Sequence, residues 1–338
     1  MLKLAACLIP VVLSSWLIWL AETPAAWEEP IGRGETRAVR MQLAAGQMVA
    51  VTVEQAEIDL TLSVEYPDGR WVEGSDRGAY GRETLLFVTG AEGDYTVEIQ
   101  ANPVGAREGR YRLSSVESRR VRESDEGALR AQDLFVQATG LDRLATADGQ
   151  ERARKLYRAA AELFRQGGYE ELAAHAKNLE GRALDRLGRR DAAYTYYLEA
   201  LRTRRKIGDE YGQLESLLQI ARLSGHLKER FSFVPDDLGF LEWWRKLGDR
   251  RGIAHAMSVV SSYYRRELKN PQEATQWAER SVQLSRQLGD QVMEARCLES
   301  LARALQASGK LDEAMRQASK ILDLQREQIG RASCRERV

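Results

Sequence analysis

The spacing of apolar residues divides the chain into two parts with different periods. In segments such as RAVRMQL, which begins at Arg37, apolar and polar residues alternate, as they do in a half-buried β-strand. From Glu123 onwards the apolar residues recur every three to four positions, which is typical of amphipathic helices. The sequence therefore predicts a β-domain over residues 30–118, followed by a helical domain over residues 123–328.

Turn residues separate the predicted strands of the first domain. Pro67, Asp68 and Gly69 stand between two strands, where proline presets φ and glycine accepts a positive φ. Short strands with one apolar face are typical of an antiparallel sandwich. The phrases LAAGQ, IDLTLSV, YPDGR, EGDYTVEI and GRYRL, in this order, resemble the bacterial pre-peptidase C-terminal domain. That resemblance implies a jelly-roll-like accessory module of secreted proteins.

The aspartates of this domain raise the question of a calcium site. Asp59, Asp68 and Asp76 lie at or beside predicted turns, where aspartate commonly bonds to the backbone or to solvent. They lack the dense spacing of acidic and amide side chains that a calcium loop uses. We therefore expect turn chemistry at these positions, and we expect neither a metal site nor a cofactor.

The helical part of the chain repeats. The phrases KIGD, KLGD and QLGD end at Asp209, Asp249 and Asp290, at spacings of 40 and 41 residues. Each glycine can end one helix in the left-handed conformation, and each aspartate can cap the next helix. With small residues at Gly181 and Ala193, where two helices would cross, the units resemble tetratricopeptide repeats of the longer type. This resemblance implies an α-solenoid whose concave groove receives peptides.

Groove positions of the tetratricopeptide family can be carried over to this chain. The predicted peptide-binding residues are Asn178, Arg182, Asp185, Glu215, Gln219, Arg222, Ser258, Ser262, Arg265, Glu299, Arg303 and Gln306. One arginine recurs in each of the four units. A row of guanidinium groups suits an acidic peptide or a terminal carboxylate. The alternative is that these arginines belong to solvated helix faces and only confer solubility.

Aromatic pairs in the helices offer another possible contact for a ligand. The pairs are Tyr196-Tyr197, Trp243-Trp244 and Tyr263-Tyr264. Adjacent residues of a helix point about 100° apart, so one member of a pair can pack in the core while the other is partly exposed. Core packing is the preferred interpretation, and Trp244 is the most plausible exception because its unit departs from the repeat pattern.

The residues that commonly carry catalysis are few and scattered. His175, His226 and His255 have no histidine or cysteine at metal-ligand spacing, and no hydrolase or protease motif occurs in the sequence. We expect each histidine at a helix surface or in a turn. Cys297 falls on the packed side of a helix, where a thiol is inert. The chain as given is therefore not expected to be an enzyme.

Charge changes along the chain together with composition. The whole chain has 50 Lys and Arg and 50 Asp and Glu, so it offers no net field to nucleic acid, and we expect no nucleic-acid partner. The net charge is −7 between Trp27 and Ser118 and +5 between Arg119 and Gln328. Because charge, composition and period all change near Ser118, we expect two domains with separate cores.

The N-terminal segment has the composition of an export signal. Lys3 precedes an apolar run from Leu4 to Ala21, and the small residues TPAA follow. This pattern predicts a signal peptide over residues 1–26, cleaved near Ala25 or Ala26. The alternative is an uncleaved membrane anchor, because the run is close to membrane-spanning length. Both interpretations place the protein outside the cytoplasm, as a periplasmic, secreted or membrane-anchored protein.

The last ten residues, Ile329–Val338, continue none of the helical periodicity. Their sequence, IGRASCRERV, matches one translated frame of a common sequencing adapter. We therefore expect an artefactual tail without tertiary contacts, a helix that stops near Gly330, and a natural reading frame that diverges after Gln328.

The order of the segments gives two functional hypotheses. A signal, a pre-peptidase-like sandwich and long-type tetratricopeptide repeats resemble the front half of bacterial CHAT-domain proteins, a family that carries a caspase-like protease fold after the repeats. The leading hypothesis is a non-catalytic, extracytoplasmic scaffold that binds a protein or peptide, with acidic segments favoured. The alternative is the regulatory N-terminal fragment of a CHAT-type cysteine protease.

Overall fold

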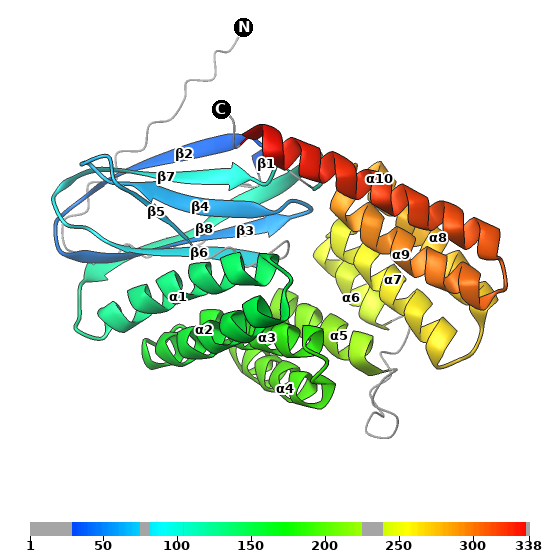
Figure 1. Cartoon of the computed structure of the whole chain (residues 1–338). Helices are drawn as coiled ribbons and strands as arrows, with labels where there is room; N and C mark the ends of the chain where they lie inside the picture. Colours follow the sequence, from blue (N-terminus) through cyan, green and yellow to red (C-terminus); the bar gives the residue numbers. More distant parts are fainter. Residues whose placement is uncertain (1–28, 75–80, 104, 225–238, 336–338) are drawn as a thin grey trace, which may run out of the picture.

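The computed structural model describes residues 29–74, 81–103, 105–224 and 239–335 (Figure 1). An antiparallel β-sandwich is followed by an array of paired helices, which confirms the predicted fold class. The predicted signal or anchor at residues 1–26, Asp76 and His226 all lie outside the described residues. No helix of the described part combines the length and apolarity that a membrane crossing requires.

The β-domain consists of two four-stranded antiparallel sheets. Their strand orders are β1-β8-β3-β6 and β2-β7-β4-β5. The strands are β1 (Glu29–Gly32), β2 (Thr36–Leu43), β3 (Gln47–Ala56), β4 (Leu60–Glu65), β5 (Trp71–Glu73), β6 (Gly81–Val88), β7 (Gly93–Ala101) and β8 (Glu108–Arg120). The predicted hairpin joins β4 to β5, and Asp68 Oδ1 accepts a hydrogen bond from the Arg70 backbone N–H at 3.0 Å. Turn chemistry at Asp68 is thus confirmed.

The sandwich core lies between the inner faces of the two sheets. Alternate residues of β3, at Val49, Val51 and Val53, are fully buried there. The rings of Phe87 and Tyr95 stack across the interior with their centroids 5.8 Å apart. The period of two in the sequence corresponds to these inward-facing positions.

Ten helices follow in the described residues, and consecutive helices pack against each other except at α5 and α6 (Figure 1). They are α1 (Asp125–Arg143), α2 (Ala147–Gln166), α3 (Glu170–Arg186), α4 (Arg190–Ile207), α5 (Glu210–Ser224), α6 (Gly239–Leu247), α7 (Arg250–Arg266), α8 (Pro271–Gln287), α9 (Gln291–Ala307) and α10 (Leu311–Arg335). Besides its pair partner, α7 packs against α5 and α9, the first helices of the neighbouring pairs. The odd-numbered helices therefore form one continuous layer of the array.

The repeated Gly-Asp phrases have the predicted cap geometry. Gly208, Gly248 and Gly289 have φ values of 73°, 68° and 62°, the left-handed region in which a side chain would be strained. The following aspartates each accept a backbone N–H through Oδ1, at 2.8, 2.9 and 2.9 Å. One phrase thus ends a helix and starts the next, and the prediction is confirmed in all three repeats.

Small residues let the helices of a pair approach closely. A Cβ atom on Gly181 would lie 2.8 Å from the Tyr197 ring and 3.1 Å from the Ala193 carbonyl oxygen. The predicted crossing point of α3 and α4 is therefore confirmed. A similar close approach joins α6 to α7, where a Cβ on Gly252 would lie 2.0 Å from the ring of Trp244. Trp244 is fully buried, so its suggested role as an exposed ligand contact is wrong.

The two domains do not have fully separate cores. No strand of the described chain comes from beyond Arg120, but Met48 of β3 and Leu86 of β6 lie in one buried cluster with Ala131 and Phe135 of α1. Both residues point to the outer face of the sheet, away from the sandwich interior. The expectation of separate cores is therefore wrong, because these strands are apolar on both faces and α1 covers the outer one.

A side chain from α1 also forms hydrogen bonds with the edge strand of this sheet. Strand β6 is an edge strand, so some of its backbone groups have no strand partner. Gln132 Oε1 accepts a hydrogen bond from the Leu86 N–H at 2.9 Å, and Gln132 Nε2 donates to the Leu86 carbonyl at 3.0 Å. This amide pairs with both backbone groups of one residue and fixes α1 on the sheet.

The β-domain also contacts the N-terminal ends of the inner helices. Arg82 pairs with Glu171 of α3 at 3.7 Å, and Gly81 closely approaches Tyr211 of α5. The Arg250 N–H of α7 donates to Glu57 Oε1 at 3.1 Å. The Arg107 N–H donates to the Leu288 carbonyl, before α9, at 3.0 Å. Arg33 adds a bond from Nη2 to the Gly289 carbonyl at 2.6 Å. The sandwich therefore contacts α3, α5, α7 and the turn before α9 along one edge of the array.

The last helix is longer than predicted. α10 continues through Gly330 to Arg335, so the predicted stop near Gly330 is wrong. One glycine costs a helix only about 1 kcal/mol relative to alanine, which is too little to end it where the flanking residues favour helix. The side chains beyond Arg326 and the final residues 336–338 lie outside the described part.

Candidate functional site

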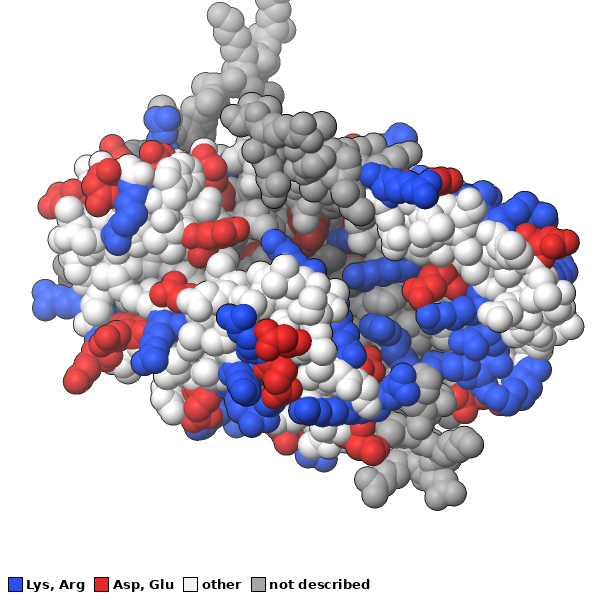
Figure 2. Space-filling view, viewed as in Figure 1, with Lys and Arg blue, Asp and Glu red and all other residues white. Residues whose placement is uncertain are grey.

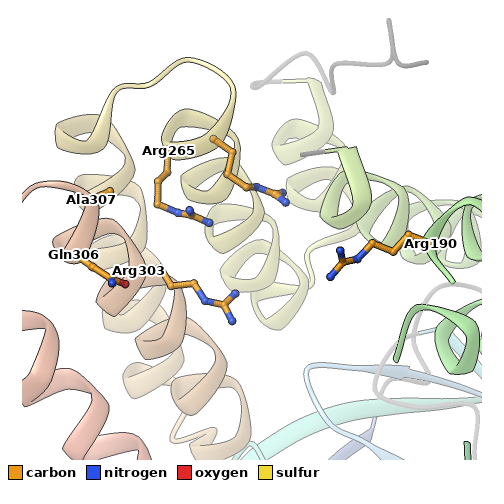
Figure 3. Close-up of a pocket in the computed structure, with 6 residues that line it drawn as sticks. Arg190, Arg265, Arg303, Gln306 and Ala307 are labelled. Carbon is orange, nitrogen blue, oxygen red and sulfur yellow. The ribbon is translucent and has the colours of Figure 1, made fainter. Parts of the chain in front are cut away.

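The molecule is hollowed between the β-domain with the first helices and the later helices, and basic side chains gather at this hollow (Figure 2). A pocket of about 570 Å³ opens there. Its lining residues are Arg190, Arg265, Arg266, Arg303, Gln306 and Ala307. The pocket thus lies between the start of α4 on one wall and the C-terminal ends of α7 and α9 on the other (Figure 3).

Arg266 is held in place by neutral main-chain acceptors. Its Nη1 donates to the Arg222 carbonyl at 3.0 Å and its Nη2 donates to the Ala221 carbonyl at 3.2 Å, near the end of α5. Its Nε donates to the Ser262 carbonyl of its own helix at 3.3 Å. These carbonyls orient the guanidinium group but carry no formal charge, so its positive charge is not neutralised by them.

Arg265 lies beside Arg266 but lacks the hydrogen bonds that orient Arg266. Within the described part of the chain, Arg265 makes neither an ion pair nor a hydrogen bond. Burial, followed by repulsion from Arg303, lowers the pKa of Arg265 below its ordinary value. Burial and the neighbouring Arg265 likewise lower the pKa of Arg266. The guanidinium groups still carry their charge near neutral pH. Burial is the main cause of both shifts, and the neighbouring arginines add to it.

Carboxylates touch the rim of the pocket but do not line it. Glu299 pairs with Arg303 at 2.5 Å, one helical turn away, and both side chains are more than half exposed. Asp185 lies 3.7 Å from Arg190 Nε. Such exposed pairs contribute little, about 0–1 kcal/mol, and can be exchanged for a better anion.

The structure brings some of the predicted groove residues together. Arg265, Arg303 and Gln306 line the pocket, and the carbonyl of Arg222 contacts Arg266 beside it. The exposed Arg222 side chain donates to Gln219 Oε1 at 3.0 Å. Three of the four predicted arginines therefore lie at or next to one site.

The fourth predicted arginine is engaged elsewhere. Arg182 Nη2 donates to Asp142 Oδ2 of α1 at 2.7 Å, and Arg186 donates to the other oxygen of the same carboxylate at 2.6 Å. Arg182 therefore has a built-in counter-charge from another helix pair. The row of arginines is not uniform along the groove. At this end the buried carboxylate of Asp142 pairs with Arg182, whereas at the pocket Arg190 and Arg303 have carboxylates only at the rim.

Other predicted groove residues serve the packing of the array. Asn178 is only 1% exposed and its Oδ1 accepts from Ser216 Oγ at 3.3 Å, so it does not face the groove as predicted. Ser258 is buried and donates to the carbonyl of His255 at 2.9 Å. Glu215 accepts from the buried Arg204 at 2.7 Å. These side chains bond within the array, so they are not free to contact a peptide.

Two pocket arginines were not among the predicted residues. Arg190 is at the start of a second helix, and only first helices were expected to line the groove. Arg266 follows Arg265 directly, and the groove positions carried over from the family included only Arg265. The doublet Arg265-Arg266 at the end of α7 was the sequence feature that could have indicated Arg266.

The remaining residues of catalytic type are buried or engaged. Cys297 is fully buried, as predicted, and burial raises the pKa of its thiol to about 11. His175 is buried rather than on a helix surface, with Nδ1 3.2 Å from Arg204 Nη2. Burial and several arginines lower the pKa of His255 to about 3. No cluster of three metal-ligating side chains occurs among the described residues.

Of the aromatic pairs, Tyr197 is fully buried beside a partly exposed neighbour, as predicted. Trp244, the suggested exception, is also fully buried beside a partly exposed neighbour. Tyr263 and Tyr264 are both partly exposed, and their ring centroids are 6.3 Å apart. Core packing therefore accounts for two of the three pairs.

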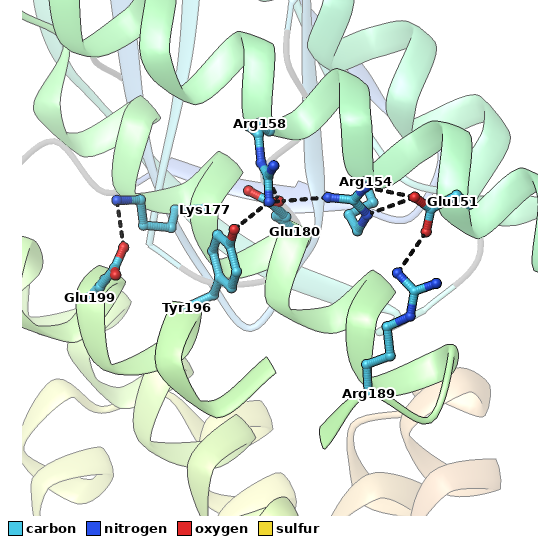
Figure 4. A network of polar contacts seen from close by, with 8 residues as sticks. All are labelled: Glu151, Arg154, Arg158, Lys177, Glu180, Arg189, Tyr196 and Glu199. Atoms are coloured by element: carbon cyan, nitrogen blue, oxygen red, sulfur yellow. Dashed lines mark hydrogen bonds and ion pairs between the residues drawn. The ribbon is translucent and has the colours of Figure 1, made fainter. Parts of the chain in front are cut away.

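A second group of charges, between α2, α3 and α4, contrasts with the pocket (Figure 4). The buried Glu180 accepts from Arg154 at 3.3 Å and from Arg158 at 2.8 Å. Glu151 accepts from Arg154 at 2.6 Å and from Arg189 at 3.2 Å. Here every arginine faces a carboxylate, so the group is a structural network that joins three helices. At the pocket, Arg265 and Arg266 form no ion pair with a described residue, and Arg190 and Arg303 have only the pairs at the rim.

Asp249 makes the stability of this region depend on pH. It is fully buried and caps α7, and burial raises the pKa of its carboxyl to about 6. An unfolded aspartate titrates near pH 3.9. Between these values the folded state holds the proton more tightly, so the contribution of Asp249 to stability falls as pH rises from about 4 to 6.

We therefore expect Asp249→Asn, which keeps the capping oxygen but cannot ionise, to raise the free energy of unfolding at pH 7 by about 1–3 kcal/mol. The gain should shrink towards zero near pH 4, as measured by urea unfolding across this range. Asp290→Asn is the matched control: Asp290 caps α9 in the same way but pairs with Arg251 at 2.6 Å, so its replacement should reduce stability. A gain at Asp249 that is equal at both pH values would contradict the assignment.

Comparison with known proteins gives likeness of fold type only. No protein-family model matches the sequence, and no curated protein matches it. Among solved structures, the chain is similar to BtubC (BKLC) from P. vanneervenii, at 15% identity and a TM-score of 0.41 over 62% of this chain and 94% of that one. Two structures of a putative kinesin light chain with TPR-like repeats from P. anserina, one of them a single-substitution variant, are 16% identical. They cover 58% of this chain and 96% of theirs, at TM-scores of 0.36 for the variant and 0.35.

Proposed function

We propose that this protein is a non-catalytic scaffold that binds an acidic segment of a partner protein at the arginine pocket of its concave face. The observation that carries this proposal is the set of four arginines around one open pocket whose lining contains no carboxylate. Guanidinium groups form charge-assisted, often bidentate hydrogen bonds with carboxylates. An acidic segment would supply the missing negative charge.

The position of the pocket relative to the β-domain supports this role. The β-domain contacts α3, α5, α7 and the turn before α9 at their N-terminal ends, while the pocket lies at the C-terminal ends of α7 and α9. The edge away from the β-domain is therefore the one that carries the pocket. Because the β-domain fixes the spacing of these helices, little ordering cost remains when a partner binds.

The buried residues of catalytic type support a binding role over a catalytic one. A nucleophilic cysteine needs an accessible thiolate, but Cys297 is fully buried and its thiol has a pKa of about 11. A general base should titrate near the working pH, whereas His255 has a pKa of about 3. The pocket itself is lined by arginines, which bind and orient anions.

Binding of a fluorescent polyglutamate peptide tests the proposal. Arg265→Glu with Arg303→Glu should weaken binding about 10- to 100-fold, since two charge-assisted contacts of about 0.7–1.4 kcal/mol each are lost. The control pair is Arg202→Glu with Arg280→Glu, on the second helices α4 and α8, where both side chains are exposed. This pair changes the net charge by the same amount and should weaken binding less than about threefold. Equal losses would show that net charge, and not the pocket, attracts the peptide.

The location and the wider context of the protein are part of the same proposal. The sandwich followed by helix pairs supports kinship of the β-domain with pre-peptidase C-terminal modules, and the N-terminal composition supports export from the cytoplasm. The same order of domains supports the alternative of a regulatory fragment of a CHAT-type protease. N-terminal sequencing of the exported protein tests the first point. The gene sequence beyond the codon of Gln328 tests the second, where a His and Cys pair in alternating β/α sequence is the supporting result.

A further inference from the structure

We infer that the arginine pocket takes a phosphate monoester group, such as a phosphorylated serine, threonine or tyrosine of the partner segment. This inference rests on the proposed function and names the chemical group that the site recognises. Four guanidinium groups line the pocket. Among the described residues, Arg303 pairs with Glu299 at 2.5 Å, and Arg190 lies 3.7 Å from Asp185.

The charge of the site exceeds what one carboxylate can neutralise. A carboxylate carries one negative charge, whereas a phosphate monoester carries about 1.5 to 2 at neutral pH and has three acceptor oxygens. Arg265, Arg266 and Arg303 line one pocket, so their like charges repel one another. This repulsion adds to burial in lowering the pKa of Arg265 and of Arg266. A dianion relieves more of this repulsion than a monoanion of similar size.

The directions of the arginines favour a tetrahedral group. Arg265 and Arg303 extend into the space from α7 and α9, and Arg190 extends towards them from the opposite wall (Figure 3). A carboxylate is planar and presents its two oxygens to one side, so a bidentate bond to one wall leaves the other wall without an acceptor. The three terminal oxygens of a phosphate ester point in different directions and can accept bonds from both walls.

One arginine of the site is oriented before any ligand binds. Arg266 uses three of its donor groups on the carbonyls of Ala221, Arg222 and Ser262, which hold its position and leave its charge available. Bonds of this kind reduce the side-chain entropy that binding would otherwise cost. The contrast with the network around Glu180 is direct, because there each arginine already has a carboxylate.

The test compares three short Gly/Ser peptides that differ at one central position, which is phosphoserine, glutamate or serine. Isothermal calorimetry on the full chain should show the phosphoserine peptide binding at least 10-fold more tightly than the glutamate peptide. Arg265→Gln with Arg190→Gln should abolish this preference, and Arg202→Gln with Arg280→Gln should leave it unchanged. Circular dichroism of the variants shows whether each one is folded.

A pH series adds a second measurement that distinguishes a phosphate group from a carboxylate. The second ionisation of phosphoserine has a pKa near 6, so its affinity should rise several-fold from pH 5.5 to pH 7.5. The glutamate peptide is already ionised throughout this range and should show no such rise. Inorganic phosphate serves as the minimal probe, and its binding should weaken in the Arg265→Gln variant.

The outcomes separate the two proposals. Equal affinity for the phosphoserine and glutamate peptides, lost with the pocket arginines, would overturn the phosphate inference and leave the acidic-segment function standing. Binding of inorganic phosphate at the pocket without binding of any peptide would overturn the peptide function and, with it, the assignment of a phosphorylated partner residue. Equal losses in the Arg202 and Arg280 control would overturn both.

Discussion

Replacing Arg204 with methionine is expected to lower the free energy of unfolding at pH 7 by about 3–5 kcal/mol, because it leaves a largely buried carboxylate without its partner. Arg204 of α4 is 1% exposed. Its Nη1 donates to the Gly212 carbonyl at 2.7 Å and to Ser216 at 2.8 Å, and its Nη2 donates to Glu215 at 2.7 Å. One side chain therefore joins α4 to α5 through three bonds.

The pH dependence of this loss identifies its cause. Although burial alone would raise the pKa of Glu215, Arg204 and His175 hold it well below its ordinary value. A lowered pKa in the folded state contributes stability that is present above the unfolded value, near 4.3, and is lost as pH falls below it. In the methionine variant Glu215 can take up a proton as pH falls, so the deficit should be largest at pH 7 and should shrink towards pH 4.

Two further variants make the test specific. Arg205→Met changes the adjacent residue, which is exposed, and should alter stability by less than about 0.5 kcal/mol. Glu215→Gln added to Arg204→Met removes the unpaired charge and should recover part of the loss. Urea unfolding at pH 7 and pH 4 measures all three. A deficit that Glu215→Gln does not reduce would show that lost packing, and not the unpaired carboxylate, is the cause.

The elements of the fold that follow from local sequence were predictable. The caps at Asp209, Asp249 and Asp290 depend on a few adjacent residues, and so does the hairpin turn at Gly69. The crossing at Gly181 depends on helical spacing within one pair. Each of these features is set by interactions over a short stretch of chain, which is why period and turn chemistry are sufficient to place them.

The contact between the domains was missed although the sequence contained a signal for it. The segments MVAV, from Met48, and LLFV, from Leu85, are apolar at consecutive positions. A strand with one solvated face alternates, whereas an unbroken apolar run is typical of a strand buried on both faces. These runs lie on β3 and β6, whose outer faces pack against α1. The alternating positions alone predict one buried face and do not indicate the second.

The site could be predicted only in part because its walls come from distant segments. Arg265 and Arg303 were accessible to the repeat pattern, since both lie on first helices. Arg190 lies on a second helix, and it reaches the pocket only because the array curves. Asp142 of α1 neutralises Arg182 from another helix pair. Curvature and such pairings depend on contacts with the β-domain and α1, which a position-by-position transfer from single repeats does not contain.

The shared core leads to the second large expected effect. Leu86→Ala should lower the free energy of unfolding by about 2.7–5 kcal/mol, the range for removing a fully buried leucine side chain and leaving a cavity. Leu86 is 0% exposed and lies in one cluster with Met48 and Phe135. Because the cavity would open between the sheet and α1, both domains should lose stability together. The helical circular dichroism and the hydrogen-exchange protection of β3 amides should therefore fall at the same urea concentration.

Leu113→Ala is the matched control for this coupling. Leu113 lies on β8 of the same sheet, but its side chain is 36% exposed, so the same substitution should change stability by less than about 0.5 kcal/mol. If Leu86→Ala reduced protection in β3 while the helical transition stayed at the wild-type urea concentration, the domains would unfold independently. The β-domain could then not fix the curvature of the array. Coincident loss in both signals, with no change for Leu113→Ala, means that the sandwich is part of the scaffold that positions the arginine pocket.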